Sequence, residues 1–488
     1  MNIPKHAGYI AGELIEGQGD TLIVEDPSTG RELTRLSGMS LDQVEAAIAG
    51  ARDCFDSGEW SELSSIRRAE LLRRFMVALA KKADAITDLV VAEAGCPKAT
   101  SVMHAQVASP LRHGSEIIDL FLSLPEIEEN PLPLNERINP MGQAVQSLRR
   151  YTPIGVVAAI AAYNFPFYTA VWKIMPALMA GNTVVLRPSP LTPLSAMLFA
   201  EAATEAGLPK GVLNIVLEPG LEGGQLLTQH PSVDMVAFTG SSKVGELIMA
   251  QAAPSMKRLQ LELGGKSAQI FMPDALDRFL PAAMGVALAH SGQGCALGTR
   301  VFVPEESKAE LLAKLGGALS RIKIGPADST ESQMGPVISA EQVERCEYFV
   351  KAALEHGGKL VAGGKRPEHL SSGYFFEPTV LDLPDNKNPA AQDEIFGPVV
   401  SVMGYRDLDH AVEMANDSRF GLSGYIHGND KKQALELALK IKSGTVNVNC
   451  GVMSAYASSG GQRSSGIGRE RGVEGIRIYQ QLTCLNIG

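Results

Sequence analysis

A chain of 488 residues is too long for one compact hydrophobic core, so we expect two or three domains. Its 44 basic and 54 acidic side chains give a net charge of -10, which argues against a nucleic-acid partner. The six cysteines form no CxxC pair and lie near no histidine cluster, a pattern that fits neither a metal site nor a disulfide framework. We therefore expect a reducing, cytoplasmic location and no metal.

The sequence also lacks the signals of a segment that enters a membrane. The first residues contain no apolar stretch of the signal-peptide kind. The longest apolar run, residues 154–163, is far shorter than the roughly 20 residues of a membrane helix. We interpret this run as a buried strand and expect no membrane partner.

The spacing of apolar residues predicts helices in the first part of the chain, over 41–49 and 66–91. Between 151 and 265, short apolar strands alternate with amphipathic helices. The predicted strands are 154–162, 183–187, 212–216, 235–239 and 259–263, and the predicted helices are 166–180, 193–206, 220–229 and 242–252. Pro166 and Pro193 suit first helical turns, and Gly181 and Gly207 suit helix C-termini. This alternation predicts a parallel sheet of the dinucleotide-binding type, with helices on both faces.

Three further regions complete the predicted organisation. A second run of alternating elements over 266–445 predicts a second α/β domain. Two segments, 126–150 and the tail 476–487, contain short strand-like stretches that belong to neither domain. Exposed edge strands pair readily with another chain, so we expect these segments to form the interface of a homodimer or homotetramer.

Cys295 lies in the glycine-rich stretch SGQGCALG, and Glu262 precedes two glycines 33 residues upstream. Glycine lets a ligand approach the backbone closely, so a thiol and a carboxylate in such settings suggest a nucleophile and a base. The alternative is an inert buried thiol, which is the more common state of a lone cysteine. The residues around Cys295 do not decide between these two interpretations.

The order of the motifs along the chain decides it, because nine segments together resemble the aldehyde dehydrogenase superfamily. They are YNFPF at 163–167, WKIMPAL at 172–178, AGNTVVLRP at 180–188, FTGSSKVG at 238–245, LELGGK at 261–266, GQGC at 292–295, GYFFEPT at 373–379, EIFGP at 394–398 and SGIGRE at 465–470. The resemblance covers essentially the whole chain. It implies a Rossmann-type NAD(P)-binding domain (1–125 and 151–262), an α/β catalytic domain (263–460) and a β oligomerisation arm (126–150 and 461–488).

The resemblance also implies a reaction. Cys295 attacks an aldehyde to form a thiohemiacetal, hydride passes to NAD(P)+, and Glu262 activates the water that hydrolyses the thioester. The side chain of Asn164 matches the oxyanion donor, and Lys173 matches a lysine near the cofactor and the oxyanion. The alternatives weighed are a helix N-cap for Asn164, a salt-bridged carboxylate for Glu262 and a solvated helix lysine for Lys173.

The cofactor site follows from the same motifs. The strand–turn–helix segment 238–245 offers a helix N-terminus to the pyrophosphate. The residues assigned to the cofactor are Ile160, Ala161, Tyr163, Arg187, Ser189, Pro190, Gly220, Gly224, Phe238, Thr239, Gly240, Ser241, Val244, Leu263, Gly264, Glu394 and Phe396. Arg187 and Pro190 replace the commoner lysine and glutamate of the family. With no carboxylate at 190 and an arginine nearby, we expect NADP to be tolerated or preferred over NAD.

By family position, the walls of the aldehyde pocket are Phe165, Thr169, Trp172, Gly294, Ala296 and Ser459. Ser459 stands where an aromatic wall is common, which suggests a roomy, uncharged tunnel for a bulky or aromatic aldehyde. Arg463 offers an alternative, since it could steer an acidic semialdehyde.

Two other activities remain open. One is a CoA-acylating dehydrogenase, which the presence of Glu262 disfavours. The other is a non-catalytic structural protein, which Cys295, Glu262 and Asn164 together disfavour.

Overall fold

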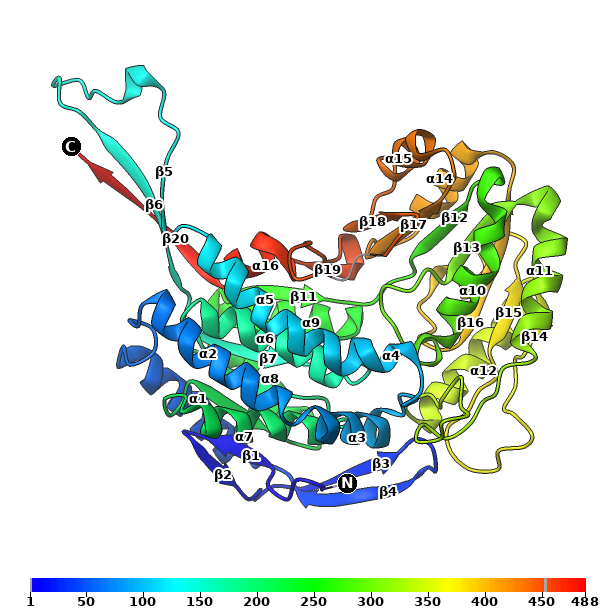
Figure 1. Ribbon diagram of the computed structural model, residues 1–488, viewed down its shortest axis with the longest axis horizontal. Coiled ribbons are helices and arrows are strands. Elements are labelled where there is room, and N and C mark those ends of the chain that lie inside the picture. The colour runs from blue at the N-terminus through cyan, green and yellow to red at the C-terminus, as the bar shows by residue number, and fades with distance from the viewer. Residues whose placement is uncertain (1, 452–453) are drawn as a thin grey trace.

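The computed structural model describes residues 2–451 and 454–488; residues 1, 452 and 453, which fall within the first two predicted domains, lie outside it. Two large sheets, each flanked by helices, stand side by side (Figure 1). A narrow three-stranded sheet projects from one end of the molecule. The predicted α/β class is therefore confirmed, with a Rossmann-type sheet, a second α/β sheet and a β arm.

The first sheet has eight strands and a dinucleotide-binding topology. Their order is β19 (Gly466–Ile467), β11 (Arg258–Glu262), β10 (Met235–Thr239), β7 (Val156–Ile160), β8 (Thr183–Arg187), β9 (Leu213–Val216), β1 (Gly8–Ile10) and β2 (Glu13–Ile15). The central strands from β11 to β9 are parallel, whereas β19 and β1 pair with them in the antiparallel sense. The chain order reverses between β7 and β10, and at such a reversal the carboxyl ends of the strands open a crevice.

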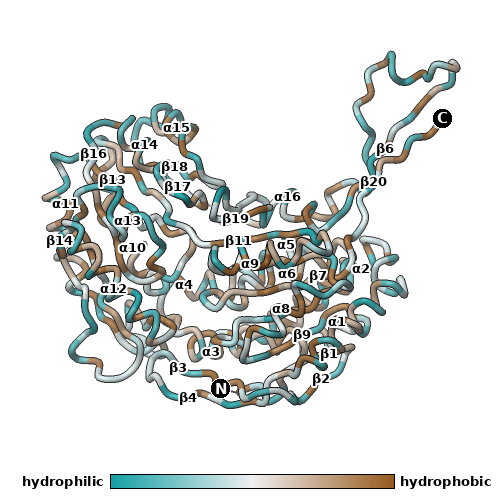
Figure 2. Tube along the Cα trace, turned by 180° about the vertical axis from the view of Figure 1, so that it is seen from behind, coloured by the Kyte–Doolittle hydropathy of each residue, from teal (hydrophilic) through white to brown (hydrophobic). Residues whose placement is uncertain are grey.

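Helices cover both faces of the first sheet. One face packs against α1 (Leu41–Asp56) and α8 (Glu222–Gln229), with α9 (Ser242–Ala252) beside α8. The other face packs against α6 (Pro166–Met179) and α7 (Met197–Ala206), and an outer layer holds α2 (Ser65–Ala80), α3 (Ala83–Ala94), α4 (Ser101–Met103) and α5 (Ser109–Ser123). The predicted helix 193–206 begins as a 3-10 turn at Leu194–Ala196, and Gly207 ends it with φ +70°. Every residue of α6 is buried, which Figure 2 shows as a hydrophobic centre to this domain.

The second sheet has seven strands and lies beside the carboxyl edge of the first. Their order is β14 (Lys359–Ala362), β15 (Thr379–Asp382), β16 (Val399–Tyr405), β13 (Arg300–Pro304), β12 (Ala268–Phe271), β17 (Ser423–His427) and β18 (Thr445–Val448). All neighbours are parallel except β14 and β15. The helices of this part are α10 (Phe279–Leu288), α11 (Glu305–Leu319), α12 (Ala340–Glu355), α13 (Pro389–Gln392), α14 (Leu408–Asn416) and α15 (Lys431–Ala438).

The arm is a sheet in the order β20 (Gln480–Ile487), β6 (Gln146–Pro153) and β5 (Ile127–Glu129), and a separate hairpin joins β3 (Thr21–Asp26) to β4 (Arg31–Ser37). The predicted arm segment 461–488 is too long, because β19 belongs to the first sheet and α16 (Gly472–Arg477) is a helix. The strand-like pattern at 476–479 misled because Ile476 and Tyr479, three residues apart, both turn into the main core. We retain the remaining domain boundaries as a proposal.

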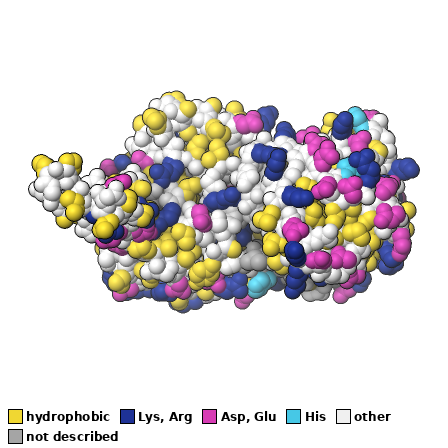
Figure 3. All heavy atoms as spheres, turned by 90° about the horizontal axis from the view of Figure 1, so that it is seen from above, with side chains coloured by type: hydrophobic (Ala, Val, Ile, Leu, Met, Phe, Trp, Pro, Cys, Tyr) yellow, Lys and Arg dark blue, Asp and Glu magenta, His cyan; other side chains and the backbone are white. Residues whose placement is uncertain are grey.

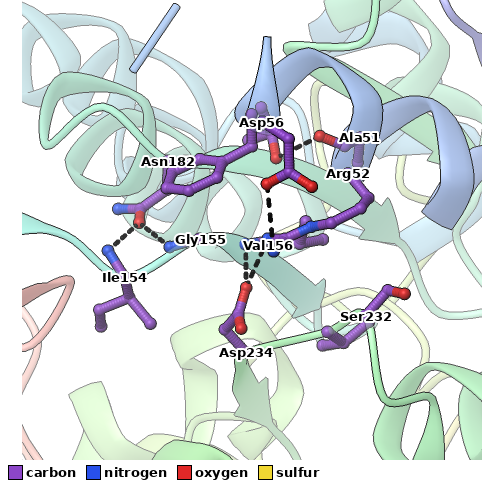
Figure 4. Close-up of polar contacts among 12 residues, drawn as sticks. Ala51, Arg52, Asp56, Ile154, Gly155, Val156, Asn182, Ser232 and Asp234 are labelled. Atoms are coloured by element: carbon purple, nitrogen blue, oxygen red, sulfur yellow. Dashed lines mark hydrogen bonds and ion pairs between the residues drawn. The ribbon is translucent and has the colours of Figure 1, made fainter. Parts of the chain in front are cut away.

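The amino edge of the first sheet is held by a compact polar network (Figure 4). The Asn182 carboxamide oxygen accepts hydrogen bonds from the N–H groups of Ile154, at 2.7 Å, and Gly155, at 2.9 Å. Asp234 accepts one from the N–H of Val156, at 2.8 Å, and forms an ion pair with Arg52 of α1, at 2.7 Å. Gly155 has φ +142°, and a Cβ there would collide with the Asp234 carboxylate. These contacts fix the amino ends of the strands whose other ends form the site.

Candidate active site

A cavity of about 820 Å³ opens at the carboxyl edge of the first sheet, where the strand order reverses. The ends of β7, β10 and β11 form one wall, through Ile160, Phe238 and Glu262. The second domain contributes the opposite wall, through Cys295 and Glu394. The fold thus brings a nucleophilic side chain to a dinucleotide-type crevice.

Most residues predicted to bind a cofactor line this cavity. They are Ile160, Ala161, Tyr163, Arg187, Ser189, Pro190, Phe238, Thr239, Gly240, Ser241, Val244, Leu263, Gly264, Glu394 and Phe396. Gly220 and Gly224 are not among the lining residues. Instead, the Gly220 carbonyl accepts a hydrogen bond from Arg187 at 2.5 Å, and the Gly224 N–H donates one to Glu218 at 2.9 Å.

The N-terminus of α9 faces the cavity and suits an anion. Ser241 is the N-cap, and its hydroxyl accepts a hydrogen bond from the Val244 N–H at 3.3 Å. Lys243, in the first turn, also lines the cavity. Helix N-termini carry a partial positive charge and free N–H groups, so this end of the cavity fits a pyrophosphate.

Several lining residues were missed by the sequence reasoning, among them Gln342 and Arg345 of α12. The Gln342 side chain donates to the carbonyls of Ile395 and Phe396, both at 2.9 Å. It thereby supports Phe396, which has a left-handed backbone with φ +61° and packs its ring edge-on to Tyr163. No motif marks α12, because its contribution arises only from tertiary packing. The other missed residues are Ala162, Leu221, Ser242, Lys243, Glu246, Arg419 and Phe420.

Arg187 differs from its predicted role as a free cationic anchor. Its Nε donates to the Glu218 carboxylate at 2.5 Å, and both side chains are buried. Glu218 also accepts hydrogen bonds from the N–H groups of Gly223 and Gly224, both at 2.9 Å. The arginine at the end of β8 is therefore neutralised by a neighbouring carboxylate.

Cys295 sits half-buried at the cavity wall, on a strained loop. His290 and Ser291, shortly before it, have left-handed backbones with φ +48° and +54°. Burial, followed by the charges of Glu394 and Glu262, raises the pKa of the Cys295 thiol to about 12. The resting side chain is thus a protonated thiol near neutral pH.

Glu262 ends β11 and lines the same cavity. Its Oε1 has no hydrogen-bond partner in the described part of the chain. Burial, followed by the charge of Glu470, holds the pKa of Glu262 well above its usual range. Gly460, with φ +149°, leaves the room that this carboxylate needs, since a Cβ there would lie 2.8 Å from Oε1. The salt-bridge alternative for Glu262 is wrong, because Glu262 forms no ion pair within the described residues.

Asn164 lies beside the nucleophile loop, just before α6. Its Nδ2 donates to the Gln293 carbonyl at 2.8 Å, which leaves its second N–H available. Its backbone carbonyl accepts a hydrogen bond from the buried side chain of Gln106 at 2.7 Å, and Gln106 belongs to a π-helical turn, His104–Ala108. The N-cap of α6 is Phe165, without a side-chain cap, so the helix-cap alternative for Asn164 is wrong.

Lys173 does not line the cavity. It is fully buried on α6, and its Nζ forms an ion pair with Glu470 at 2.8 Å. The alternative of a solvated helix lysine is therefore wrong. The charge of Glu470 raises the pKa of Glu262 and the charge of Lys173 lowers it, so this ion pair affects the proposed base electrostatically.

The predicted substrate residues come from three segments of the chain. Phe165, Thr169 and Trp172 belong to the start and inner face of α6, Gly294 and Ala296 flank Cys295, and Ser459 pairs with Glu470 through backbone hydrogen bonds of 2.8 Å. None of them lines the cofactor cavity. A charge does lie beside this predicted wall, because the Arg471 guanidinium is 5.4 Å from the Trp172 ring centre; the uncharged tunnel stays a prediction. Arg463 is exposed and donates to the carbonyls of Asn416 and Ser418, at 3.0 and 2.7 Å; its role in steering a semialdehyde stays a prediction.

Two kinds of feature are absent from residues 2–451 and 454–488. No group of three or more His, Cys, Asp or Glu side chains is placed to hold a metal ion. No helix there is both long enough and apolar enough to cross a bilayer.

A dinucleotide crevice beside a cysteine, a carboxylate and a carboxamide defines an oxidoreductase with a covalent step. Residues 14–485 match the family model described as the aldehyde dehydrogenase family. A putative aldehyde dehydrogenase, DhaS, of Bacillus subtilis (strain 168) is 34% identical over 477 residues, covering 97% of this chain and 94% of the relative. The betaine aldehyde dehydrogenase of the same organism is 35% identical over 488 residues, with 97% and 96% covered.

Solved structures give the same result. The betaine aldehyde dehydrogenase of Staphylococcus aureus in complex with NAD+ superposes with a TM-score of 0.93 at 32% identity, covering 99% of this chain and 95% of that one. A mutant of aldehyde dehydrogenase C from Pseudomonas syringae, in complex with NAD+ and octanal, gives a TM-score of 0.92 at 32% identity, with 99% and 98% covered. The chain belongs to the aldehyde dehydrogenase family, and it oxidises an aldehyde to the corresponding acid.

Proposed function

We propose that the oxidation proceeds through a thiohemiacetal and a thioester on Cys295, with NAD+ as the hydride acceptor. The observation that carries this proposal is the convergence of Cys295, Glu262 and Asn164 at one cavity on a dinucleotide-binding sheet. The cavity fits the cofactor: the α9 N-terminus suits its pyrophosphate, and Glu394 is positioned for a ribose. When bound, its nicotinamide ring takes up the hydride.

Three residues of the chain form the covalent bond, stabilise the negative charge on the aldehyde oxygen and accept a proton from water. The Cys295 thiol gives its proton to solvent water as its sulfur bonds to the aldehyde carbon, and the carbonyl oxygen becomes an oxyanion. The free N–H of Asn164 and the Cys295 backbone N–H donate hydrogen bonds to this oxygen. Departure of the hydride leaves a thioester. Glu262, once ionised, takes a proton from the water that attacks the thioester, which releases the acid and restores the thiol.

Initial rates of NADH formation from a panel of aldehydes test this proposal. Cys295→Ala should reduce the rate to background, whereas Cys484→Ala, a control at an exposed cysteine of the arm, should retain it. Added CoA should change neither the rate nor the product, because water resolves the thioester. CoA-dependent turnover would instead support the acylating alternative.

We further propose that NAD+ is preferred over NADP+. The expectation of NADP use depended on the absence of a carboxylate at position 190 and on a nearby arginine, and that arginine, Arg187, is paired with Glu218 at 2.5 Å. The Glu218 carboxylate therefore offsets the charge that would attract a 2'-phosphate. The wild type should show the higher kcat/KM with NAD+, and Glu218→Gln, which frees Arg187, should raise the NADP+/NAD+ ratio severalfold. A wild type that favours NADP+ would contradict this proposal.

The arm supports a homo-oligomer, which we propose as the working form. It carries exposed apolar side chains (Figure 3), and these include Ile127, Leu134, Ile138, Met141, Leu482, Leu485 and Ile487. Strand β20 also forms an uncovered edge of its sheet. Sedimentation at micromolar concentration should show a dimer or tetramer, and Leu485→Lys should shift the population toward monomer.

We also propose a reducing, cytoplasmic location, which the six free cysteines support.

A further inference from the structure

Arg471 is a charged side chain near the nucleophile that the proposed reaction leaves without a task. Its backbone is left-handed, with φ +60°, a strained conformation for a residue other than glycine. The guanidinium lies over the rings of Trp172 and Tyr168, 5.4 and 5.8 Å from their centres. Within residues 2–451 and 454–488 its side chain forms no ion pair or hydrogen bond, and its buried Nε has no acceptor.

The aromatic rings beneath Arg471 mark the substrate side of the nucleophile. Phe165, Tyr168 and Trp172 pack edge to face along α6, with ring centres 6.0 Å apart at each step. This wall begins one residue after Asn164, which lines the cofactor cavity, yet the wall itself lies outside that cavity. The charge of Arg471 also favours the ionised form of Cys295, so the guanidinium lies within electrostatic reach of the thiol. Arg471 and the aromatic wall thus lie near the thiol but outside the cofactor cavity.

The carboxylates near the thiol do not neutralise Arg471. Glu470 is paired with Lys173 at 2.8 Å, and Glu394 accepts a hydrogen bond from the Gly265 N–H at 2.9 Å on the cofactor side. Burial raises the pKa of Glu262 well above its usual range, which favours its uncharged form. A guanidinium stacked on ring faces still presents its N–H edge, which matches the geometry of a planar carboxylate.

We propose that Arg471 binds a carboxylate at the far end of the substrate, so that the enzyme acts on aldehydes that carry an acid group. This inference rests on the proposed chemistry at Cys295 and adds the substrate class. Straight-chain semialdehydes and carboxylated aromatic aldehydes both belong to this class. A cationic aldehyde such as betaine aldehyde is repelled by the same guanidinium.

Matched pairs of aldehydes test the inference, because each pair differs mainly in charge. The pairs are 4-carboxybenzaldehyde with 4-methylbenzaldehyde, and adipic semialdehyde with hexanal. For at least one pair the wild type should favour the acid by roughly 10- to 100-fold in kcat/KM, the range expected of a charge-assisted contact. In Arg471→Gln the ratio of kcat/KM between the acid and its neutral partner should fall by a similar factor. Arg471→Lys keeps the positive charge but loses the two parallel N–H groups of the guanidinium, so its ratio should lie between those of the wild type and Arg471→Gln.

Arg463→Gln is the matched control, since Arg463 is also an arginine with a left-handed backbone, φ +56°, but bonds only to surface carbonyls. In this variant the ratio of kcat/KM between the acid and its neutral partner should equal that of the wild type. Melting temperature and NAD+ binding check that each variant is folded. A wild type without preference for the acid, or a ratio unchanged in Arg471→Gln, would overturn the inference. If Arg471→Gln lowered kcat/KM equally for both members of a pair, the inference would also be overturned. Arg471 would then influence the Cys295 thiol and would not bind the substrate carboxylate. If no aldehyde of any charge yields NADH, the proposed function itself fails.

Discussion

The two edges of the first sheet differ in how their polar groups are satisfied. At the amino edge, Asn182 makes four hydrogen bonds of 2.7 to 3.0 Å, and Asp234 is tied both to a strand and to Arg52. At the carboxyl edge, Glu262 has an oxygen without a partner, and burial raises the pKa of Cys295 to about 12. On one side the same strands end in a network that bonds Asn182 and Asp234 and leaves only the Arg52 Nε without a partner among its described side chains, and on the other side they end beside the unsatisfied Glu262 oxygen.

This difference indicates that polar contacts stabilise the fold at the amino edge of the sheet, whereas the groups at the carboxyl edge lower its stability. Unsatisfied buried groups and left-handed residues cost free energy, and they persist only where the surroundings hold them in place. The amino-edge network supplies that rigidity without contacting the site. Substitutions at the two edges should therefore separate activity from stability.

The largest expected effect comes from Asn164→Ala at the carboxyl edge. Loss of one oxyanion donor typically costs about 2.7–4 kcal/mol in the barrier, so kcat should fall roughly 100- to 1000-fold. Initial rates of NADH formation measure this fall, with NAD+ affinity as the control for a preserved cofactor site. A kcat close to that of the wild type would show that Asn164 does not contact the reacting oxygen.

Asn182→Ala makes the same substitution at the amino edge and should give the opposite result. It removes four hydrogen bonds from a fully buried side chain, so the free energy of unfolding should fall by about 2–4 kcal/mol. The folded enzyme should keep its kcat within about twofold, since the substitution lies at the far ends of the strands. Urea unfolding and initial rates at 25 °C provide the two readouts. A loss of kcat without a loss of stability would contradict the separation of the two edges.

A smaller, pH-dependent effect is expected at Glu394. Burial raises the pKa of this carboxyl from about 4.5 to about 7 in the folded chain. As the pH rises through this window the unfolded chain loses its proton first, so the wild type loses stability. Glu394→Gln has no such proton, and its stability relative to the wild type should therefore increase between pH 4.5 and 7, by up to roughly 3 kcal/mol. Melting temperatures at pH 5 and pH 8 test this, and an equal difference at both would contradict it.

The sequence was most informative where chemistry and local structure share one motif. Strands 183–187 and 235–239 were predicted to the residue, because short, mostly apolar runs bounded by turns leave few alternatives. Cys295, Glu262 and Asn164 were found together because each lies in its own motif. The cofactor cavity contains these three and most of the predicted lining residues.

What the sequence did not reveal depends on contacts between distant segments. Arg187 was expected to be free, and only the fold shows Glu218 beside it, 31 positions along the chain. Gln342 and Arg345 reach the site because α12 packs behind the Glu394 loop. Arg471 follows a recognisable motif, but its contact with Trp172 joins α16 to α6 across nearly 300 residues. Pairings of this kind leave no local signal.

The covalent role of Cys295 can be measured in Glu262→Gln, which lacks the base that releases the acid. Mixing this variant with NAD+ and an aldehyde should produce a burst of about one NADH per active site, followed by a slow steady state. Mass spectrometry of the intact chain should then show one acyl group, and peptide mapping should place it on Cys295. Linear turnover without a burst, or an acyl group on another cysteine, would contradict the proposed mechanism.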